Sequence, residues 1–86
     1  MKNRNELSKG EAEFMEFFRH FDISDGECIA WNNIDSAQQS NKYMSPPAWK
    51  KVEELAKSLV DKEYIEKKGD VFCLLKTGEK YLYGDY

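Results

Sequence analysis

The sequence has no long apolar run, few cysteines and no basic excess among its 86 residues. A membrane-spanning helix needs about 20 consecutive apolar residues, so we expect no association with a membrane. Small secreted domains tend to carry several disulfides, whereas this chain has only Cys28 and Cys73, at a spacing that matches no zinc or redox motif. Residues 1–6 also lack the apolar stretch of a secretory signal. These absences predict a cytoplasmic protein.

Motifs for catalysis, metals and cofactors are missing as well. His20 is the single histidine, and no second ligand at a metal-binding spacing accompanies it. We expect it to interact favourably with the dipole at a helix end. The sequence contains no phosphate-cradling glycine loop, no nucleophile elbow and no histidine–carboxylate motif. We therefore expect no enzyme, no catalytic residue, no metal and no cofactor.

The charge balance counts against a generic nucleic-acid-binding protein. The net charge is −3 and the sequence pI is about 5.1, whereas nucleic-acid-binding domains usually have a basic balance. Residues 45–68 are the exception, with six lysines and five acidic residues. Hydrophobic residues make up 41% and aromatic residues 14% of the chain, which is enough to bury a core. We predict one folded domain, residues 8–86, after a short tail, residues 1–7.

A capping box and an aromatic stripe indicate a first helix. Ser8 and Glu11 have the spacing at which a serine caps a helix start and a glutamate bonds back to it. Four phenylalanines then follow at helical intervals: Phe14, Phe17, Phe18 and Phe21. This pattern predicts a helix over residues 9–21.

The next two segments are less clearly marked. Residues 27–31 suit either a short strand or a helix start that Ser24 and Glu27 would cap. Residues 35–42 are polar and suit a short helix that begins at Asp35. Both segments are expected to connect the first helix to a longer one.

The longer helix is predicted over residues 46–62. Prolines 46 and 47 are tolerated in a first helical turn, and Ser45 is a suitable cap before them. Apolar residues then recur at helical spacing: Trp49, Val52, Leu55, Ala56, Leu59 and Val60. We expect Phe17, Phe18, Val52, Leu55 and Leu59 to be buried together where this helix meets the first one.

A β-hairpin signature follows the long helix. Residues 64–67 and 71–75 are the two strands, joined by a glycine-containing turn at residues 68–70. Residues 77–79 mark a further turn or a helix cap. The aromatic residues over 81–86 leave the form of the C-terminal segment open.

The second half of the chain resembles winged-helix regulators. Residues 55–70 look like the end of a recognition helix that runs into a wing, and residues 74–82 resemble the closing of such a wing in MarR-like and PadR-like proteins. The similarity covers residues 34–82 and is one of residue classes. It implies an α+β fold, a small winged helix with a helix, a short strand, two helices and a β-hairpin wing. In such folds the short strand joins the wing, which would bring Cys28 close to Cys73.

This placement leaves two interpretations of the cysteines. The two thiols could face each other and act as a redox pair. No basic residue adjoins either of them in the sequence to activate a thiolate. We therefore favour reduced, mostly buried cysteines that react slowly with thiol reagents.

The winged-helix resemblance also implies a DNA-binding surface. Its candidate residues lie at the start of the long helix, along it and at the hairpin tip: Ser45, Lys50, Lys51, Lys57, Lys67 and Lys68. Phosphate contacts supply most of the affinity for DNA, and the first turn of this helix has few side chains that could bond to base edges. The lysines would therefore act mainly on phosphates. The alternative is a solvated helix face with ion pairs such as Lys50–Glu54 and Glu53–Lys57.

Aromatic residues suggest further contacts. Trp49 lies on the apolar stripe and is expected in the core, whereas Trp31 suits either the core or a partner interface. The aromatic residues of the first helix and of the C-terminal segment exceed what one small core needs. A homodimer through these two segments would cover the surplus.

These observations favour a small winged-helix DNA-binding protein, a transcriptional regulator with duplex DNA as its partner. The alternative is a winged-helix module for protein–protein contact that does not bind DNA, such as a small regulator or inhibitor from a mobile element or virus. A small-molecule or redox sensor on the same fold is the third interpretation. One continuous positive stripe over helix and hairpin would favour DNA, whereas lysines scattered among acids would favour a protein partner.

Overall fold

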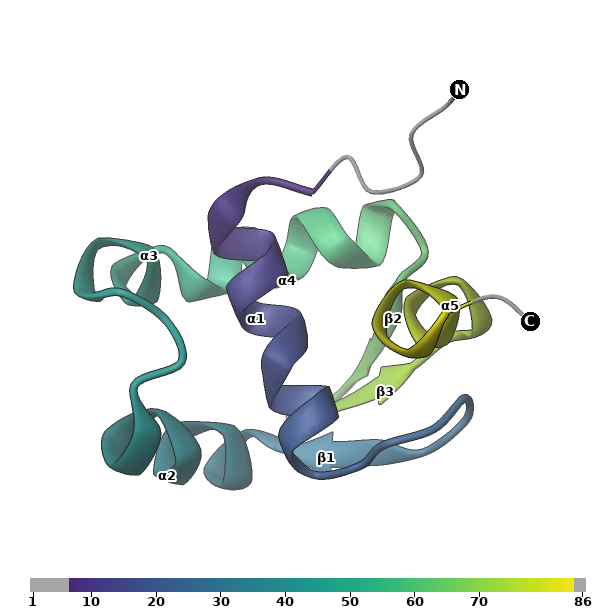
Figure 1. The fold of residues 1–86 in the computed structure, drawn as a ribbon, viewed down its shortest axis with the longest axis horizontal. Coiled ribbons are helices and arrows are strands. Elements are labelled where there is room, and N and C mark those ends of the chain that lie inside the picture. Colours follow the sequence, from purple (N-terminus) through teal and green to yellow (C-terminus); the bar gives the residue numbers. More distant parts are fainter. Residues whose placement is uncertain (1–6, 85–86) are drawn as a thin grey trace.

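The computed structural model describes residues 7–84, which form five helices and one three-stranded antiparallel sheet (Figure 1). The elements follow one another as α1 (Lys9–His20), β1 (Cys28–Ala30), α2 (Trp31–Asn41), α3 (Pro46–Lys50), α4 (Val52–Asp61), β2 (Ile65–Lys68), β3 (Val71–Leu74) and α5 (Lys76–Tyr83). The predicted α+β class is confirmed. Within this part of the chain, no helix is long and apolar enough to cross a membrane.

The predicted first helix is confirmed, together with its cap. The Ser8 hydroxyl accepts a hydrogen bond from the Glu11 amide at 3.2 Å, and the Glu11 carboxylate accepts one from the Ser8 amide at 2.8 Å. Phe14, Phe17 and Phe18 are fully buried. The helix therefore lies in the centre of the molecule, between α4 and the elements around the sheet (Figure 1).

The ambiguous segment after α1 is a strand. β1 pairs with β3, and the sheet order β1-β3-β2 places β3 in the middle. The Ser24 amide does donate to the Glu27 carboxylate at 2.7 Å, but this bond closes a turn that leads into β1. The short strand thus joins the hairpin as its third member.

The helix expected to begin at Asp35 begins four residues earlier, at Trp31. No side chain caps it; instead the Trp31 amide donates to the Asp70 carbonyl of the hairpin at 2.9 Å. The start of α2 is therefore set by sheet pairing, not by a capping residue. At its other end, the Gln38 side chain bonds to both the amide and the carbonyl of buried Met44, which fixes the loop before α3.

The single helix predicted over residues 46–62 is divided into α3 and α4. The break lies at Lys51, with φ of −107° and ψ of 20°, and the Lys51 amide donates to the Ala48 carbonyl. Val52 and Leu59 are buried as expected. Leu55 is half-buried and packs against the core, so its expected burial is confirmed only in part.

The hairpin confirms the predicted strands to within one residue at each end, with Gly69 at a φ of 64° in the turn. Residues 76–83, whose form the sequence left open, are the helix α5. Gly78 is buried on this helix, and a Cβ there would collide with the Tyr64 carbonyl oxygen. Glycine therefore lets α5 lie directly against the end of the α4–β2 connection. Tyr86 and most of the expected tail at residues 1–7 lie outside the described residues, while Leu7 packs against the core.

Candidate functional site

An open groove lies between α4 and the β2–β3 hairpin. Its volume is about 580 Å³, which falls within the roughly 300–1,000 Å³ range of ligand sites. One wall is a face of α4, formed by Val52, Glu53, Ala56, Lys57 and Val60. The opposite wall comes from the hairpin and from the first residue of α2, formed by Lys67, Gly69, Asp70, Phe72 and Trp31. Three elements far apart in the sequence thus build one concave surface.

Aromatic packing fixes the bottom of this groove. Trp31 stacks on Trp49 with ring centroids 5.5 Å apart and planes 7° apart. Trp31 also packs against Phe72, with ring centroids 6.3 Å apart, and Phe72 in turn packs edge-on against buried Phe14 with ring centroids 5.7 Å apart. Trp31 and Trp49 are both half-buried. Trp31 therefore belongs both to the core and to the surface, because its ring packs against other aromatic rings and also lines the groove.

The rim of the groove is charged but balanced. Glu53 and Lys57 stand on the α4 wall, and Lys67 and Asp70 stand on the hairpin wall. All four residues are exposed. The Lys67 ammonium donates to the Gly69 carbonyl at 2.7 Å, which holds this lysine against the turn. Each wall therefore offers one acid and one base around an apolar floor.

The residues predicted to bind DNA are all exposed, but the structure brings only Lys57 and Lys67 into the groove. Lys68 follows Lys67 in β2, and successive strand residues point to opposite faces. Ser45, Lys50 and Lys51 flank or belong to α3 and do not line the groove. The Ser45 side chain makes no cap hydrogen bond, although its amide donates to the Glu13 carboxylate at 3.2 Å.

The ion pairs expected for a merely solvated helix face are not formed. Neither Lys50–Glu54 nor Glu53–Lys57 is an ion pair within 4 Å, although all four residues are described. Along α4, Lys57 lies among three acids: Glu53, Glu54 and Asp61. The surface of α4 and the hairpin therefore carries lysines scattered among acids.

Sequence reasoning missed the apolar residues of the groove. Val52, Ala56 and Val60 follow helical spacing, and Phe72 lies in a strand. Val52 was expected in the core, and nothing in the sequence assigned any of the four to a binding surface. Val52, Ala56 and Phe72 are indeed buried, and Val60 is half-buried. A shared phase on one helix face is the only signal that could have grouped the α4 residues.

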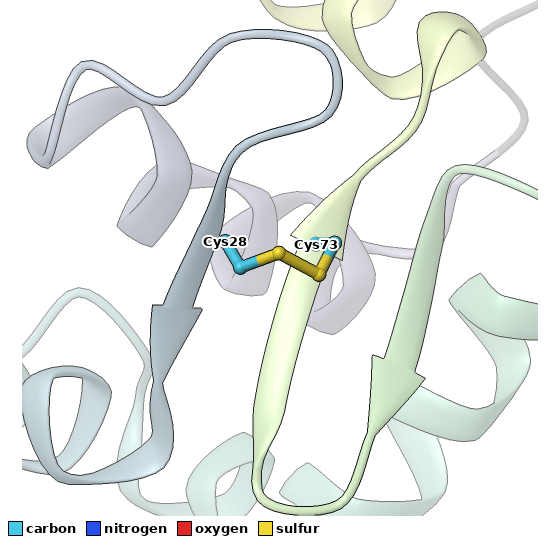
Figure 2. Close-up of a disulfide and its surroundings, with 2 residues drawn as sticks. All are labelled: Cys28 and Cys73. Carbon is cyan, nitrogen blue, oxygen red and sulfur yellow. A yellow bond between two sulfur atoms is a disulfide. The ribbon is translucent and has the colours of Figure 1, made fainter.

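The two cysteines form a disulfide between β1 and β3 (Figure 2). They are Cα partners in the antiparallel register, so strand pairing alone brings their side chains together. The expectation that both are reduced and mostly buried is wrong. Cys73 is 3% exposed, whereas Cys28 is an exposed residue. The expected closeness of the two residues is confirmed.

A buried carboxylate lies outside the groove, at the start of α1. Glu11 is 3% exposed and accepts hydrogen bonds from the Ser8 amide, the Ser58 hydroxyl and, at 2.9 Å, the Lys62 ammonium. Burial raises the pKa of Glu11, but these hydrogen bonds and the Lys62 charge outweigh it, so the pKa falls below 4.5. The carboxylate is thus held ionised and joins α1 to α4.

His20 has a partner that the sequence did not indicate. Its Nδ1 lies 2.6 Å from the Tyr43 hydroxyl, and its ring packs edge-on against Phe21. Among residues 7–84, no three His, Cys, Asp or Glu side chains are grouped so that they could hold a metal ion.

Comparison with known proteins gives no relative for this chain. No family model, no curated protein and no solved structure matches it.

Proposed function

We propose that this chain is a winged-helix domain that binds an amphipathic helix of another protein in the groove between α4 and the hairpin. The sheet order β1-β3-β2, in which the strand after α1 joins a hairpin, supports the winged-helix assignment. The observation that carries the function is the groove itself, an apolar floor with two bases and two acids on its rim.

The rim charges favour a protein over a nucleic acid. Glu53 and Asp70 would face the phosphates that Lys57 and Lys67 would attract, so the groove offers a polyanion no net attraction. Its apolar residues also gain nothing from a phosphate backbone. A protein segment, in contrast, can bury apolar side chains on the floor and place charges of both signs against the rim.

An α-helix suits the shape of the groove better than a single small ligand. The α4 wall extends from Val52 to Val60, a span of about 12 Å at 1.5 Å per residue. Helices that dock in grooves present apolar anchors at i, i+3 or i+4 and i+7, which match this span. We therefore assign as partner a helix with two or three large apolar anchors flanked by one acid and one base on each side.

A photocrosslinking experiment tests this proposal. Replacing Lys57 with p-benzoylphenylalanine places the crosslinker on the groove wall, and the same replacement at exposed Gln39 on α2 is the control. The proposal is supported if a partner protein is crosslinked from position 57 and not from position 39. The crosslinked segment of that partner, once purified, should then bind the unmodified domain. No position-specific adduct, or binding of the segment outside the groove, overturns it.

A charge swap then tests the pattern of the rim. The double variant E53K/K57E keeps net charge and composition but reverses the charges on the α4 wall, and K50E/E54K is the matched swap outside the groove. We expect E53K/K57E to weaken binding of the segment at least about tenfold, as misplaced interfacial charges do, and K50E/E54K to leave it unchanged. Equal effects of the two swaps would contradict a site in the groove.

Duplex DNA is the second candidate partner, and the unpaired lysines favour it. Lys50, Lys51, Lys57 and Lys68 are exposed and have no ion-pair partner within the described part of the chain. If the domain binds a labelled duplex at low salt, replacing Lys67 and Lys68 with alanine should weaken binding to all sequences alike. The salt dependence should flatten by about one unit for each lost contact. Absence of duplex binding at low salt would exclude this candidate.

A cytoplasmic location stays a proposal: two cysteines fall short of the disulfide density of small secreted domains, although a lasting disulfide such as Cys28–Cys73 is rare in the cytoplasm. The homodimer through α1 and the C-terminal segment stays a prediction. The phenylalanines Phe14, Phe17 and Phe18 that motivated it pack into the core of this chain. Sedimentation velocity over a range of concentrations tests it, and a single monomeric species would exclude it.

A further inference from the structure

The disulfide lies on the outer face of the sheet, opposite the core. Residues paired across a sheet share a face, and the register aligns Cys28 with Cys73 and Cys73 with Glu66. The next pair along each strand, formed by Ile29 and Phe72, points into the core and is buried. Figure 2 shows the bridge crossing between the two strands, in front of the helices drawn behind the sheet. The bridge therefore lies on a face where Cys28 and Glu66 are both exposed.

We propose that this bridge is a reversible redox site at which small thiols attack the sulfur of Cys28. Cys28 is exposed and Cys73 is 3% exposed, so an incoming thiolate reaches the Cys28 sulfur first. The Cys28–Cys73 bond breaks, a mixed disulfide forms on Cys28, and Cys73 leaves as a thiolate that takes up a proton. A second thiol then attacks the mixed disulfide and releases Cys28 as a thiol. In balance, one protein disulfide and two thiols give a protein dithiol and one small disulfide.

The charge beside the bridge selects the class of thiol. Glu66 is the Cα partner of Cys73 and shares its face, while Lys68 is paired with Val71, two residues further along. The nearer charge has the larger effect because the interaction falls with distance. The site should therefore react faster with cationic or neutral thiols than with thiols that carry a carboxylate.

Opening the bridge loosens β1, which is three residues long. Without the covalent bond, backbone hydrogen bonds hold β1 and its flanking residues to the hairpin. Among them, the Leu74 amide donates to the Glu27 carbonyl and the Trp31 amide donates to the Asp70 carbonyl, each at 2.9 Å. β1 leads directly into Trp31, which lines the groove. The redox state of the bridge and the shape of the groove thus depend on the same short strand. The chemistry at Cys28 does not depend on what the groove binds.

Reduction of the native protein by two small thiols of opposite charge tests the proposal. Cysteamine is the cationic thiol and 3-mercaptopropionate the anionic one, with rates per thiolate followed by mass spectrometry. We expect second-order reduction, a rate several-fold higher with cysteamine at low salt, and a smaller ratio in Glu66→Gln, where the acid paired with Cys73 is lost. Reduction at a rate independent of thiol concentration would mean that the bridge opens only by unfolding, and would overturn the proposal.

Single-cysteine variants identify the attacked sulfur. In Cys73→Ser the remaining Cys28 should form a mixed disulfide with oxidised cysteamine rapidly, whereas in Cys28→Ser the remaining Cys73 should do so at least about tenfold more slowly because it is shielded. Circular dichroism is used to check that both variants are folded. Equal rates, or faster reaction of Cys73, would contradict attack at Cys28, and the wild-type kinetics give an answer even if one variant fails to fold.

Hydrogen exchange reports the structural consequence. The amides of Trp31 and Leu74 should exchange faster in the reduced protein than in the oxidised one, while amides in the middle of α1 change little. Equal exchange of Trp31 and Leu74 in both redox states would show that the bridge does not control β1.

Discussion

Replacing Glu11 with glutamine should destabilise the protein more than the same change at Glu16, which lies later on the same helix α1. Glu11 is 3% exposed and has three hydrogen-bond donors around its carboxylate. The Glu16 carboxylate instead lies 3.3 Å from Arg19 in an ion pair whose side chains are 40% and 53% exposed. The two positions therefore compare a buried charge with a surface charge on one helix.

The expected loss follows from the partners of Glu11. A hydrogen bond to a charged group contributes about 1.5–3 kcal/mol, but the Lys62 side chain is 38% exposed, so water can replace its bond to Glu11. Ser8 is an exposed residue, so its amide can likewise bond to water, while Ser58 is half-buried. We therefore expect Glu11→Gln to lower the free energy of unfolding by about 2 kcal/mol. Glu16→Gln should lower it by less than about 1 kcal/mol.

The pH dependence gives a second, independent measurement. The hydrogen bonds and the Lys62 charge outweigh burial and hold the pKa of Glu11 in the folded state below the ordinary value of 4.5. A depressed folded pKa stabilises the fold fully above the unfolded pKa, and this contribution is lost as the pH falls through the folded pKa. The difference in the free energy of unfolding between wild type and Glu11→Gln should therefore be largest near neutral pH and decrease below about pH 4.5.

Urea unfolding followed by tryptophan fluorescence measures both effects at several pH values. The Glu16→Gln variant controls for the loss of one negative charge from the same helix. Equal destabilisation of the two variants near neutral pH would refute the assignment of Glu11 as a buried, bonded carboxylate. A stability difference between wild type and Glu11→Gln that stays the same at acid pH would refute the lowered pKa of Glu11.

Three further changes test the packing and the bridge. Leu59→Ala should cost about 2–5 kcal/mol because Leu59 is fully buried, and Leu55→Ala should cost less because Leu55 is half-buried; equal losses in urea unfolding would contradict this difference. Gly78→Ala should lower the melting temperature markedly, since its Cβ would collide with a backbone carbonyl, and an unchanged melting temperature would show that α5 can shift. Removing the disulfide with C28S/C73S opens a loop with a sequence separation of 45, which by loop entropy costs about 4 kcal/mol; a loss below about 1 kcal/mol would show that the bridge constrains the unfolded chain little.

The sequence predicted those elements whose capping or turn residues and hydrophobic periodicity lie within the element itself. The helix α1 is of this kind, because Ser8 and Glu11 form the cap and the phenylalanines supply the buried stripe. The hairpin is of this kind too, since Gly69 supplies the positive φ that its turn needs. In both cases the residues that specify the element lie within it.

Tertiary contacts decided what the sequence pattern left out. The break at Lys51 has no glycine or proline to mark it, and Trp49 just before it stacks on Trp31, which lies 18 residues earlier in the chain. Glycine in a helix interior is normally unfavourable, so Gly78 argued against a helix over 76–83. There the close approach of α5 to the Tyr64 carbonyl requires glycine.

The disulfide could not be deduced from composition or spacing. Cys28 and Cys73 are paired by strand register, and a shift of β1 by one residue would turn Cys28 to the other face of the sheet. The sequence indicated that the two lie near each other, through the winged-helix resemblance alone. Their redox state depends on geometry that only the folded sheet supplies.

The charged residues of the candidate site could be predicted from the sequence, whereas its apolar residues could not. Exposed lysines can be recognised in a sequence, and two of the six predicted residues, Lys57 and Lys67, do line the groove. Val60 cannot be recognised as a groove residue, because apolar residues at helical spacing look the same whether a neighbouring element covers them or not. What distinguishes it is the hairpin, which stands beside α4 and leaves Val60 half-buried. A charged residue can thus be assigned to the surface from the sequence. An apolar residue can be assigned to a binding surface only when the fold shows that no neighbouring element covers it.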